Sequence, residues 1–231
     1  MEAIILAGGL GTRLRSRIRD VPKSMAEVAG KPFLQILFDR LVGQGCSSIV
    51  LSLGYLRDVI IDAYQTSYKG VPLTYAIEET PLGTGGAIRL ALQQASEPSV
   101  LVLNGDTYLD VNFAAMLAAH RSVGRPITMA ITQVPDVGRY GGVTTMHGRV
   151  TGFTEKGQTG PGCINAGVYV LERMFPWPEN LEERFSFETD ILAHHVTQLS
   201  PAAFQCDGQF LDIGIPEDLD RAQVDLKRFG L

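Results

Sequence analysis

The sequence predicts an α/β protein built on a Rossmann-like, mostly parallel sheet with helices on both faces. Short apolar segments rich in β-branched residues alternate with segments whose apolar residues recur at helical spacing. The first apolar segment runs directly into a glycine-rich stretch, as a buried strand does before a tight turn. Hydrophobic residues make up 45% of the chain, which is ample for a large core.

The first half of the chain predicts four buried strands separated by three helices. The expected strands are residues 3–6, 48–53, 73–77 and 100–103, all short and apolar. Apolar residues recur at helical spacing in each interval between them, namely Phe33, Leu34, Leu37, Phe38 and Leu41, then Leu56, Val59, Ile60 and Ala63, then Ala87, Ile88, Ala91 and Leu92. A β-α-β series of this kind implies a mostly parallel sheet.

The second half predicts further strands joined by short glycine-containing turns, followed by two helices. Strands are expected at residues 127–134, 142–146, 150–153 and 166–171. A helix is expected near Ser186, a suitable N-cap with Glu188 and Asp190 in its first turn. The last helix is expected at Pro216, because proline is accepted in a first helical turn. Without a repeat or a clear linker, residues 1–231 are expected to form a single domain.

Composition restricts the partners and the compartment. The formal net charge is -5, and the basic residues cluster near the N-terminus, which suits a small anionic substrate better than a nucleic acid. The three cysteines are far apart and form neither a zinc pattern nor a disulfide framework. No apolar stretch is long enough for a membrane span or typical of a signal peptide. We therefore expect a cytoplasmic protein without nucleic-acid or membrane partners, and the sequence leaves a homo-oligomer open.

The glycine-rich stretch Leu6-Ala7-Gly8-Gly9-Leu10-Gly11-Thr12-Arg13 predicts a phosphate-binding loop. Glycines let backbone N–H groups approach a ligand, and the basic residues that follow (Arg13, Arg15, Arg17, Arg19 and Lys23) would neutralise a polyphosphate. The spacing fits neither the dinucleotide fingerprint, which needs a third glycine where Leu14 stands, nor a P-loop. An ordinary strand-to-helix turn remains the alternative for the glycines alone.

Two aspartates follow short apolar segments at expected strand ends. Asp106 comes after residues 100–103, and Asp212 comes after Phe210 and Leu211. Ligands of parallel sheets bind beyond the carboxyl ends of strands, and Mg²⁺ commonly uses one or two carboxylates together with substrate phosphates. The two aspartates could thus hold one metal, although a simple turn explains either motif equally well.

Taken in order, these motifs resemble the sugar-1-phosphate nucleotidyltransferase family over nearly the whole chain. The resemblance rests on the opening loop through Leu14, Pro22-Lys23, Glu78-Glu79-Thr80-Pro81-Leu82-Gly83-Thr84-Gly85, Asn104-Gly105-Asp106, Arg139-Tyr140-Gly141, Phe153-Thr154-Glu155-Lys156, Asn165-Ala166-Gly167 and Asp212-Ile213-Gly214. Two positions depart from the common pattern: Ser24 replaces a second proline, and Phe210 replaces a tryptophan. Both concern loop shape or packing and leave the charged groups intact.

The resemblance implies a nucleotide-binding N-terminal half, a sugar-phosphate-binding C-terminal half, and a role for each matching residue. The implied catalytic residues are Arg13, Lys23 and Asp106. The implied nucleotide-binding residues are Leu6, Gly8, Gly9, Gly11, Thr12, Arg13, Lys23, Glu78, Gly83 and Asp106. The implied sugar-phosphate-binding residues are Gly141, Glu155, Lys156 and Asn165, and the implied Mg²⁺ ligands are Asp106 and Asp212. In the implied reaction the phosphate of a sugar 1-phosphate attacks the α-phosphorus of a nucleoside triphosphate, and pyrophosphate leaves. The attacking group is already an anion, so positioning and charge neutralisation suffice.

The resemblance implies that Glu78 and Gly83 read the base, and the chemistry of Glu78 predicts which base it is. A carboxylate only accepts hydrogen bonds, and guanine offers it two neighbouring donors, N1–H and the 2-amino group, whereas uracil and thymine offer one donor between carbonyls. We therefore expect GTP, with neighbouring Glu79 or a backbone amide as the alternative group that reads the base. Overall similarity and the short chain favour a heptose 1-phosphate as the sugar, with mannose, glucose or N-acetylmuramate 1-phosphate as alternatives. A non-catalytic sugar-nucleotide sensor on the same fold is a further alternative, and the missing third glycine argues against an NAD-dependent oxidoreductase.

Overall fold

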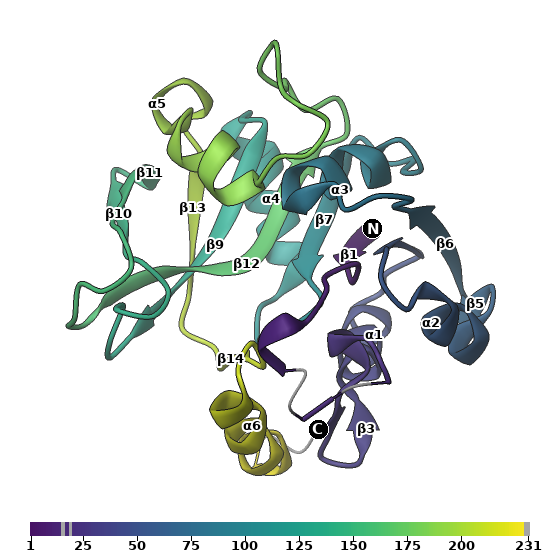
Figure 1. Cartoon of the computed structure of the whole chain (residues 1–231). Helices are drawn as coiled ribbons and strands as arrows, with labels where there is room; N and C mark the ends of the chain where they lie inside the picture. Colours follow the sequence, from purple (N-terminus) through teal and green to yellow (C-terminus); the bar gives the residue numbers. More distant parts are fainter. Residues whose placement is uncertain (15–16, 19, 229–231) are drawn as a thin grey trace.

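The centre of the protein is a large sheet that crosses the whole molecule (Figure 1). The computed structural model describes residues 1–14, 17–18 and 20–228, without the side chains of Arg13, Lys227 and Arg228. Within this part the sheet has ten strands, in the spatial order β10 (Val143–Met146), β11 (Arg149–Phe153), β13 (Ala202–Cys206), β9 (Ile127–Val134), β12 (Gly162–Glu172), β7 (Ser99–Asn104), β1 (Glu2–Leu6), β4 (Ser48–Leu53), β6 (Val71–Ile77) and β5 (Ser67–Tyr68).

Most strands of the sheet run in the direction of β1, as the sequence predicts. Strands β7, β1, β4 and β6 pair in parallel. Strand β12 is antiparallel to both of its neighbours, so β9 again runs with β1, and β13 pairs with β9 in parallel. The carboxyl ends of β1, β4 and β7 therefore lie at one edge, where polar residues after these strands meet.

Helices cover both faces of the sheet, which confirms the expected layers (Figure 1). Neighbouring residues of β1 separate the two cores: Ala3 and Ile5 belong to one, and Ile4 to the other. The first core takes buried residues from α1 (Phe33–Gly43), α4 (Phe113–Val123) and α6 (Pro216–Arg228). The second takes them from α3 (Gly83–Leu92) and from the π-helix η3 (Phe187–Ala193), which precedes α5 (Val196–Leu199). None of the described helices is both long and apolar enough to span a membrane.

The structure adds elements that the apolar pattern did not predict. Helix α4 has clear signals, because Asn112 caps it by accepting a hydrogen bond from Ala115 N–H at 2.9 Å, and Gly124 ends it at φ 61°. Strand β13 lacks the β-branched residues that would have indicated it. Helix α2 (Arg57–Tyr64) begins after Leu56, which we expected inside it but which adopts φ 56°. Ser186 caps η3, as expected, and its hydroxyl accepts a hydrogen bond from Thr189 N–H at 3.2 Å.

Short elements outside the main sheet hold several functional candidates. Helix η1 (Thr12–Leu14) follows the opening loop, and η2 (Lys23–Met25) begins at the predicted lysine; a small hairpin of β2 (Glu27–Val28) and β3 (Lys31–Pro32) comes next. Strands β8 (Thr107–Leu109) and β14 (Phe210–Asp212) form a separate antiparallel ladder in which Asp212 pairs with Thr107. This ladder brings Asp212 next to Asp106, and α6 follows it directly (Figure 1).

Candidate active site

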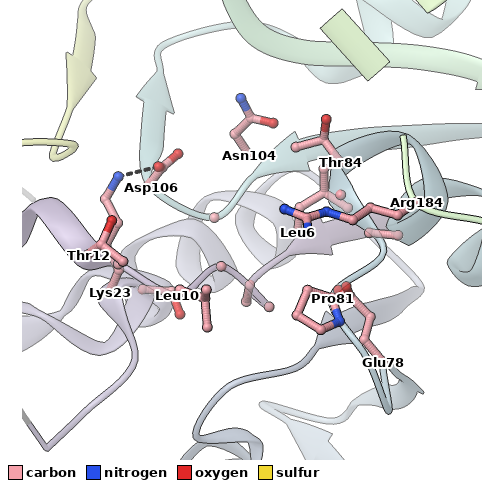
Figure 2. A pocket seen from close by; sticks show the side chains of 18 residues that line it. Leu6, Leu10, Thr12, Lys23, Glu78, Pro81, Thr84, Asn104, Asp106 and Arg184 are labelled. Atoms are coloured by element: carbon pink, nitrogen blue, oxygen red, sulfur yellow. Dashed lines mark hydrogen bonds and ion pairs between the residues drawn. The ribbon is translucent and has the colours of Figure 1, made fainter. Parts of the chain in front are cut away.

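A cavity of about 400 Å³ lies beyond the carboxyl ends of β1 and β7 (Figure 2). Its walls are the opening loop, the start of η2, the turn before α3, residues 104–106 and Arg184. Predicted nucleotide-binding residues that line it are Leu6, Gly8, Gly9, Gly11, Thr12, Lys23, Glu78, Gly83 and Asp106. The tenth, Arg13, belongs to η1, but its side chain lies outside the described part of the structure, so its role stays a prediction.

The opening loop is shaped by close backbone contacts. Ala7 N–H donates to Ser52 C=O at 2.9 Å, which fixes the start of the loop on β4. Gly11 adopts φ 56°, and its C=O accepts from Leu14 N–H at 2.9 Å, which starts η1. Gly105 N–H donates to Leu6 C=O at 2.9 Å, and a Cβ at Gly105 would stand 2.5 Å from that oxygen. The loop therefore approaches residues 104–106 as closely as backbones allow.

The basic residues after the loop do not all face the cavity. Arg15 and Arg19 lie outside the described residues. Arg17 pairs with Asp220 of α6 at 2.8 Å on the surface, so the expected contribution of Arg17 to phosphate binding is not supported. Lys23 does line the cavity, where its ammonium group forms an ion pair with Asp106 (Figure 2). The lysine side chain is only 18% exposed, so its charge is directed at this site.

Asp212 lies beside Asp106 through the β8–β14 ladder. Ile213 N–H donates to Asp106 C=O at 3.0 Å, and the Asp212 carboxylate accepts from Gly214 N–H at 2.6 Å and from Arg139 at 3.0 Å. Burial and then the charge of Asp106 raise the pKa of Asp212, although Lys23 and Arg139 act in the opposite direction. The two carboxylates therefore crowd negative charge at one place, which suits a cation.

The carboxylate pair is an incomplete ligand set by itself. No group of three or more His, Cys, Asp or Glu side chains that could hold a metal occurs among the described residues. Mg²⁺ commonly takes one or two protein carboxylates and completes its octahedron with water and substrate phosphates. The donor set of Asp106 and Asp212 at the edge of a phosphate loop fits that pattern.

Glu78 stands on the cavity wall near the start of the opening loop. Its carboxylate accepts from Ser52 Oγ at 3.2 Å and from Leu82 N–H at 3.1 Å, so each oxygen has one protein partner. A Cβ on Gly8 would lie 2.4 Å from Glu78 Oε1, so glycine is what allows the carboxylate this position. Gly83 has φ 71° and packs against the backbone of Phe185, since a Cβ there would stand 2.5 Å from its C=O. Both predicted base-reading residues therefore adjoin the cavity in fixed positions.

The predicted sugar-phosphate residues lie in the C-terminal half and do not line this cavity. A Cβ on Gly141, which has φ 84°, would stand 2.8 Å from Thr154 C=O and 3.9 Å from Lys156 Cγ, so Gly141 and Lys156 are neighbours. Glu155 and Lys156 are both exposed. Asn165 donates to Tyr169 Oη at 2.7 Å and accepts from Gly167 N–H at 3.0 Å. That turn adjoins the cavity, because a Cβ on Gly167 would lie 2.7 Å from Asn104 Nδ2.

The structure also assigns positions to residues to which the sequence analysis gave no role. Arg139 bonds Asp212 and forms an ion pair with Asp218 of α6; its place in the Arg139-Tyr140-Gly141 motif was the available signal. Arg184 lines the cavity and carried no signal in its sequence neighbourhood. Ser24, the departure from the proline pattern, is buried beside Lys23, and its hydroxyl has no hydrogen-bond partner among the described residues.

The chain is similar to known proteins over almost its whole length. The sequence profile described as "Nucleotidyl transferase" matches residues 2–228. The chain is 42% identical to a D-glycero-alpha-D-manno-heptose 1-phosphate guanylyltransferase of Aneurinibacillus thermoaerophilus, over 99% of this chain and 100% of that protein. A protein of the same name from Campylobacter jejuni is 39% identical, over 94% and 96% of the two chains.

A solved structure shares the whole fold. The crystal structure of HddC from Yersinia pseudotuberculosis complexed with GMP-PN is 37% identical and superposes with a TM-score of 0.84, covering 97% of this chain and 99% of that one. Together with the sequence profile and the full-length relatives, this likeness places the chain in the nucleotidyl transferase family.

Proposed function

We propose that this protein transfers the guanylyl group of GTP to D-glycero-D-manno-heptose 1-phosphate and releases pyrophosphate. The observation that carries the proposal is the carboxylate of Glu78, held on the cavity wall by Ser52 and Leu82. Each of its two oxygens keeps a free lone pair, and the two oxygens together match the two adjacent donors of guanine. The names of the two full-length relatives, both heptose 1-phosphate guanylyltransferases, support the same base and sugar. On the cysteine usage of the sequence, we place the reaction in the cytoplasm.

The chain's own residues contribute charge and position to the reaction. The attacking sugar phosphate is an anion, so no residue has to remove a proton from it. The opening loop presents backbone N–H groups to the triphosphate, and Lys23 directs its ammonium group to the same cavity. Arg13 would add a second cation at the pyrophosphate end. We expect the Lys23–Asp106 ion pair to loosen when phosphates bring competing negative charge.

Asp106 and Asp212 would hold one Mg²⁺. A bound Mg²⁺ neutralises phosphate charge and orients the oxygens of the reacting groups. Arg139 keeps Asp212 in place from the side of α6, since it contacts both Asp212 and Asp218. The C-terminal helix thereby supports the site without reaching the cavity.

The sugar 1-phosphate would bind in the C-terminal half, next to the nucleotide cavity. Lys156 would contact its phosphate, and Gly141, Glu155 and Asn165 would contact the sugar. Gly141 lies against Lys156, and the turn after Asn165 lies against Asn104 of the cavity. These contacts support a path for the acceptor from Lys156 towards Asp106 and the α-phosphate.

Measuring the release of pyrophosphate with each pair of substrates tests the proposed reaction, base and sugar together. The purified protein would be assayed with GTP, ATP, UTP, CTP and dTTP against heptose, mannose, glucose and N-acetylmuramate 1-phosphates, with Mg²⁺ present. We expect the highest kcat/KM with GTP and the heptose. If a pyrimidine nucleotide has the highest kcat/KM, the role given to Glu78 is contradicted. If another sugar 1-phosphate has the highest kcat/KM, that sugar and not the heptose is the acceptor. Nucleotide binding without any turnover would favour the non-catalytic sensor.

A further inference from the structure

Arg184 is an unexplained cation of the nucleotide cavity. It lies in the segment between β12 and η3, is exposed, and reaches into the cavity. In Figure 2, the Arg184 side chain extends from the side of Pro81 and Glu78 towards the middle of the view, and Lys23, Thr12 and Asp106 lie on the opposite side. Among the described residues, no hydrogen bond or ion pair engages its guanidinium group. Lys23 thus serves the phosphate end of the cavity, whereas Arg184 enters the cavity from the side of Glu78.

The backbone directly after Arg184 is fixed to the turn that also positions Glu78. Phe185 N–H donates to Leu82 C=O at 3.0 Å, and Phe185 C=O accepts from Gly85 N–H at 3.0 Å. The Phe185 ring fills the space above Gly85, where a Cβ would stand 2.2 Å from a ring carbon. Leu82 N–H in turn donates to Glu78 at 3.1 Å. One turn therefore anchors both the Glu78 carboxylate and the backbone that carries Arg184.

A carboxylate and a guanidinium group at one end of a cavity match two adjoining edges of guanine. The N1–H and 2-amino donors face a carboxylate, and the neighbouring O6 and N7 acceptors form the edge that arginine binds bidentately in nucleic acids. Adenine offers a donor in place of O6 and an acceptor in place of N1–H, so it opposes both groups. Uracil has no N7 at all.

We propose that Arg184 is a specificity-determining residue that hydrogen-bonds the O6/N7 edge of the guanine while Glu78 takes the N1/2-amino edge. The proposal rests on the proposed function, because it names the group that completes recognition of GTP. It makes base selection the work of both halves of the chain: Glu78 comes from the nucleotide half, and Arg184 comes from the segment before η3.

Two GTP analogues separate the two edges. In 7-deaza-GTP a C–H replaces N7, and ITP lacks the 2-amino group. The variants are Arg184→Ala, Arg184→Lys, Glu78→Gln and the control Glu182→Ala, which removes a nearby exposed side chain that does not line the described cavity. Arg184 is exposed, so its replacement should leave the melting temperature unchanged, and kcat/KM is measured for each pair.

We expect Arg184→Ala to lower kcat/KM for GTP on the order of tenfold and to abolish the preference for GTP over 7-deaza-GTP. The preference for GTP over ITP should survive in Arg184→Ala and shrink in Glu78→Gln. Arg184→Lys should recover only part of the preference for GTP over 7-deaza-GTP, since an ammonium group can donate to O6 and N7 but lacks the planar fork of arginine. Glu182→Ala should behave as the unaltered protein.

Three results would overturn the proposal. An Arg184→Ala variant that loses activity equally with GTP, 7-deaza-GTP and UTP, and that lysine rescues, would place Arg184 on the phosphates. An equal loss that lysine does not rescue would indicate stacking on any base. No loss at all would remove Arg184 from the site. If the unaltered protein does not prefer GTP, the proposed function itself is wrong, and that result appears before any variant is measured.

Discussion

Replacing Gly8 by alanine should weaken base selection without unfolding the protein. The new Cβ would stand 2.4 Å from Glu78 Oε1 and 3.0 Å from Gly54 N. The carboxylate is the end of a flexible side chain, so it should move and give up its contacts with Ser52 at 3.2 Å and Leu82 at 3.1 Å. We expect the loss of the paired contact to guanine to reduce the ratio of kcat/KM for GTP over UTP by about five- to 150-fold, which corresponds to about 1–3 kcal/mol of discrimination.

The same change should cost little stability. Two weakened hydrogen bonds remove about 1–3 kcal/mol, and the smaller conformational entropy of unfolded alanine returns about 0.4–1 kcal/mol. The net loss of at most about 2.6 kcal/mol should lower the melting temperature of a chain of this size by no more than about 10 °C. Calorimetry and the nucleotide ratio are measured together, so that lost activity is not confused with lost structure.

Gly9→Ala is the matched control. Gly9 lies in the same loop and lines the same cavity, but a Cβ added to Gly9 would have no neighbouring heavy atom within 4 Å among the described residues. An alanine there could hinder the triphosphate of every nucleotide alike, which leaves the ratio of GTP to UTP unchanged. The reasoning is refuted if Gly8→Ala keeps the original ratio, or if both variants change the ratio equally.

The remaining predictions concern the metal site, the acceptor and two buried groups. Asp106→Asn should keep the fold, judged by circular dichroism, and lower kcat by orders of magnitude at saturating Mg²⁺; near-normal turnover would remove Asp106 from the metal site. Lys156→Ala should raise the KM for sugar 1-phosphate and leave the KM for GTP nearly unchanged, and steady-state kinetics with each substrate varied would show the opposite pattern if Lys156 served the nucleotide. Burial raises the pKa of Cys206 to about 11, so a thiol reagent at pH 8 should label partly exposed Cys163 first, and a rapid phase that persists in Cys163→Ala would contradict this. Burial also raises the pKa of Tyr64 to about 12, so the folded protein keeps a proton that the unfolded chain releases near pH 10. The free energy of unfolding should therefore fall between about pH 10 and 12. Urea titrations of Tyr64→Phe should show a smaller fall over the same range.

The apolar pattern predicted most of the sheet because its strands are short, buried on both faces and rich in β-branched residues. Residues 48–53 and 127–134 form β4 and β9 with the expected ends. The pattern failed where burial is one-sided or the composition is unusual, as in β13. It also did not indicate β8, which is only three residues long and has its partner far along the chain.

The sequence likewise predicted only part of the candidate site. The glycine loop, Lys23 and Asp106 belong to local motifs, and the structure brings them to one cavity. Arg184 could not be predicted, because it reaches the cavity only through the packing of Phe185 on α3. Likewise, the contact of Arg139 with Asp212 depends on β14 and α6. Such contacts are set by tertiary structure, and no spacing in the sequence encodes them.

The alignment of the short β8–β14 ladder links the carboxylate site to the stability of the fold. Only three residue pairs align it, and Asp212 faces the site in one of the possible alignments. Because side chains alternate along a strand, a slip by one residue would turn Asp212 to the opposite side. The same slip would turn Leu211, which is buried in the first core, towards the opposite side. The pairing that brings the two carboxylates together is therefore the pairing that buries Leu211, and a molecule that lost the carboxylate pair would also unfold at a lower temperature.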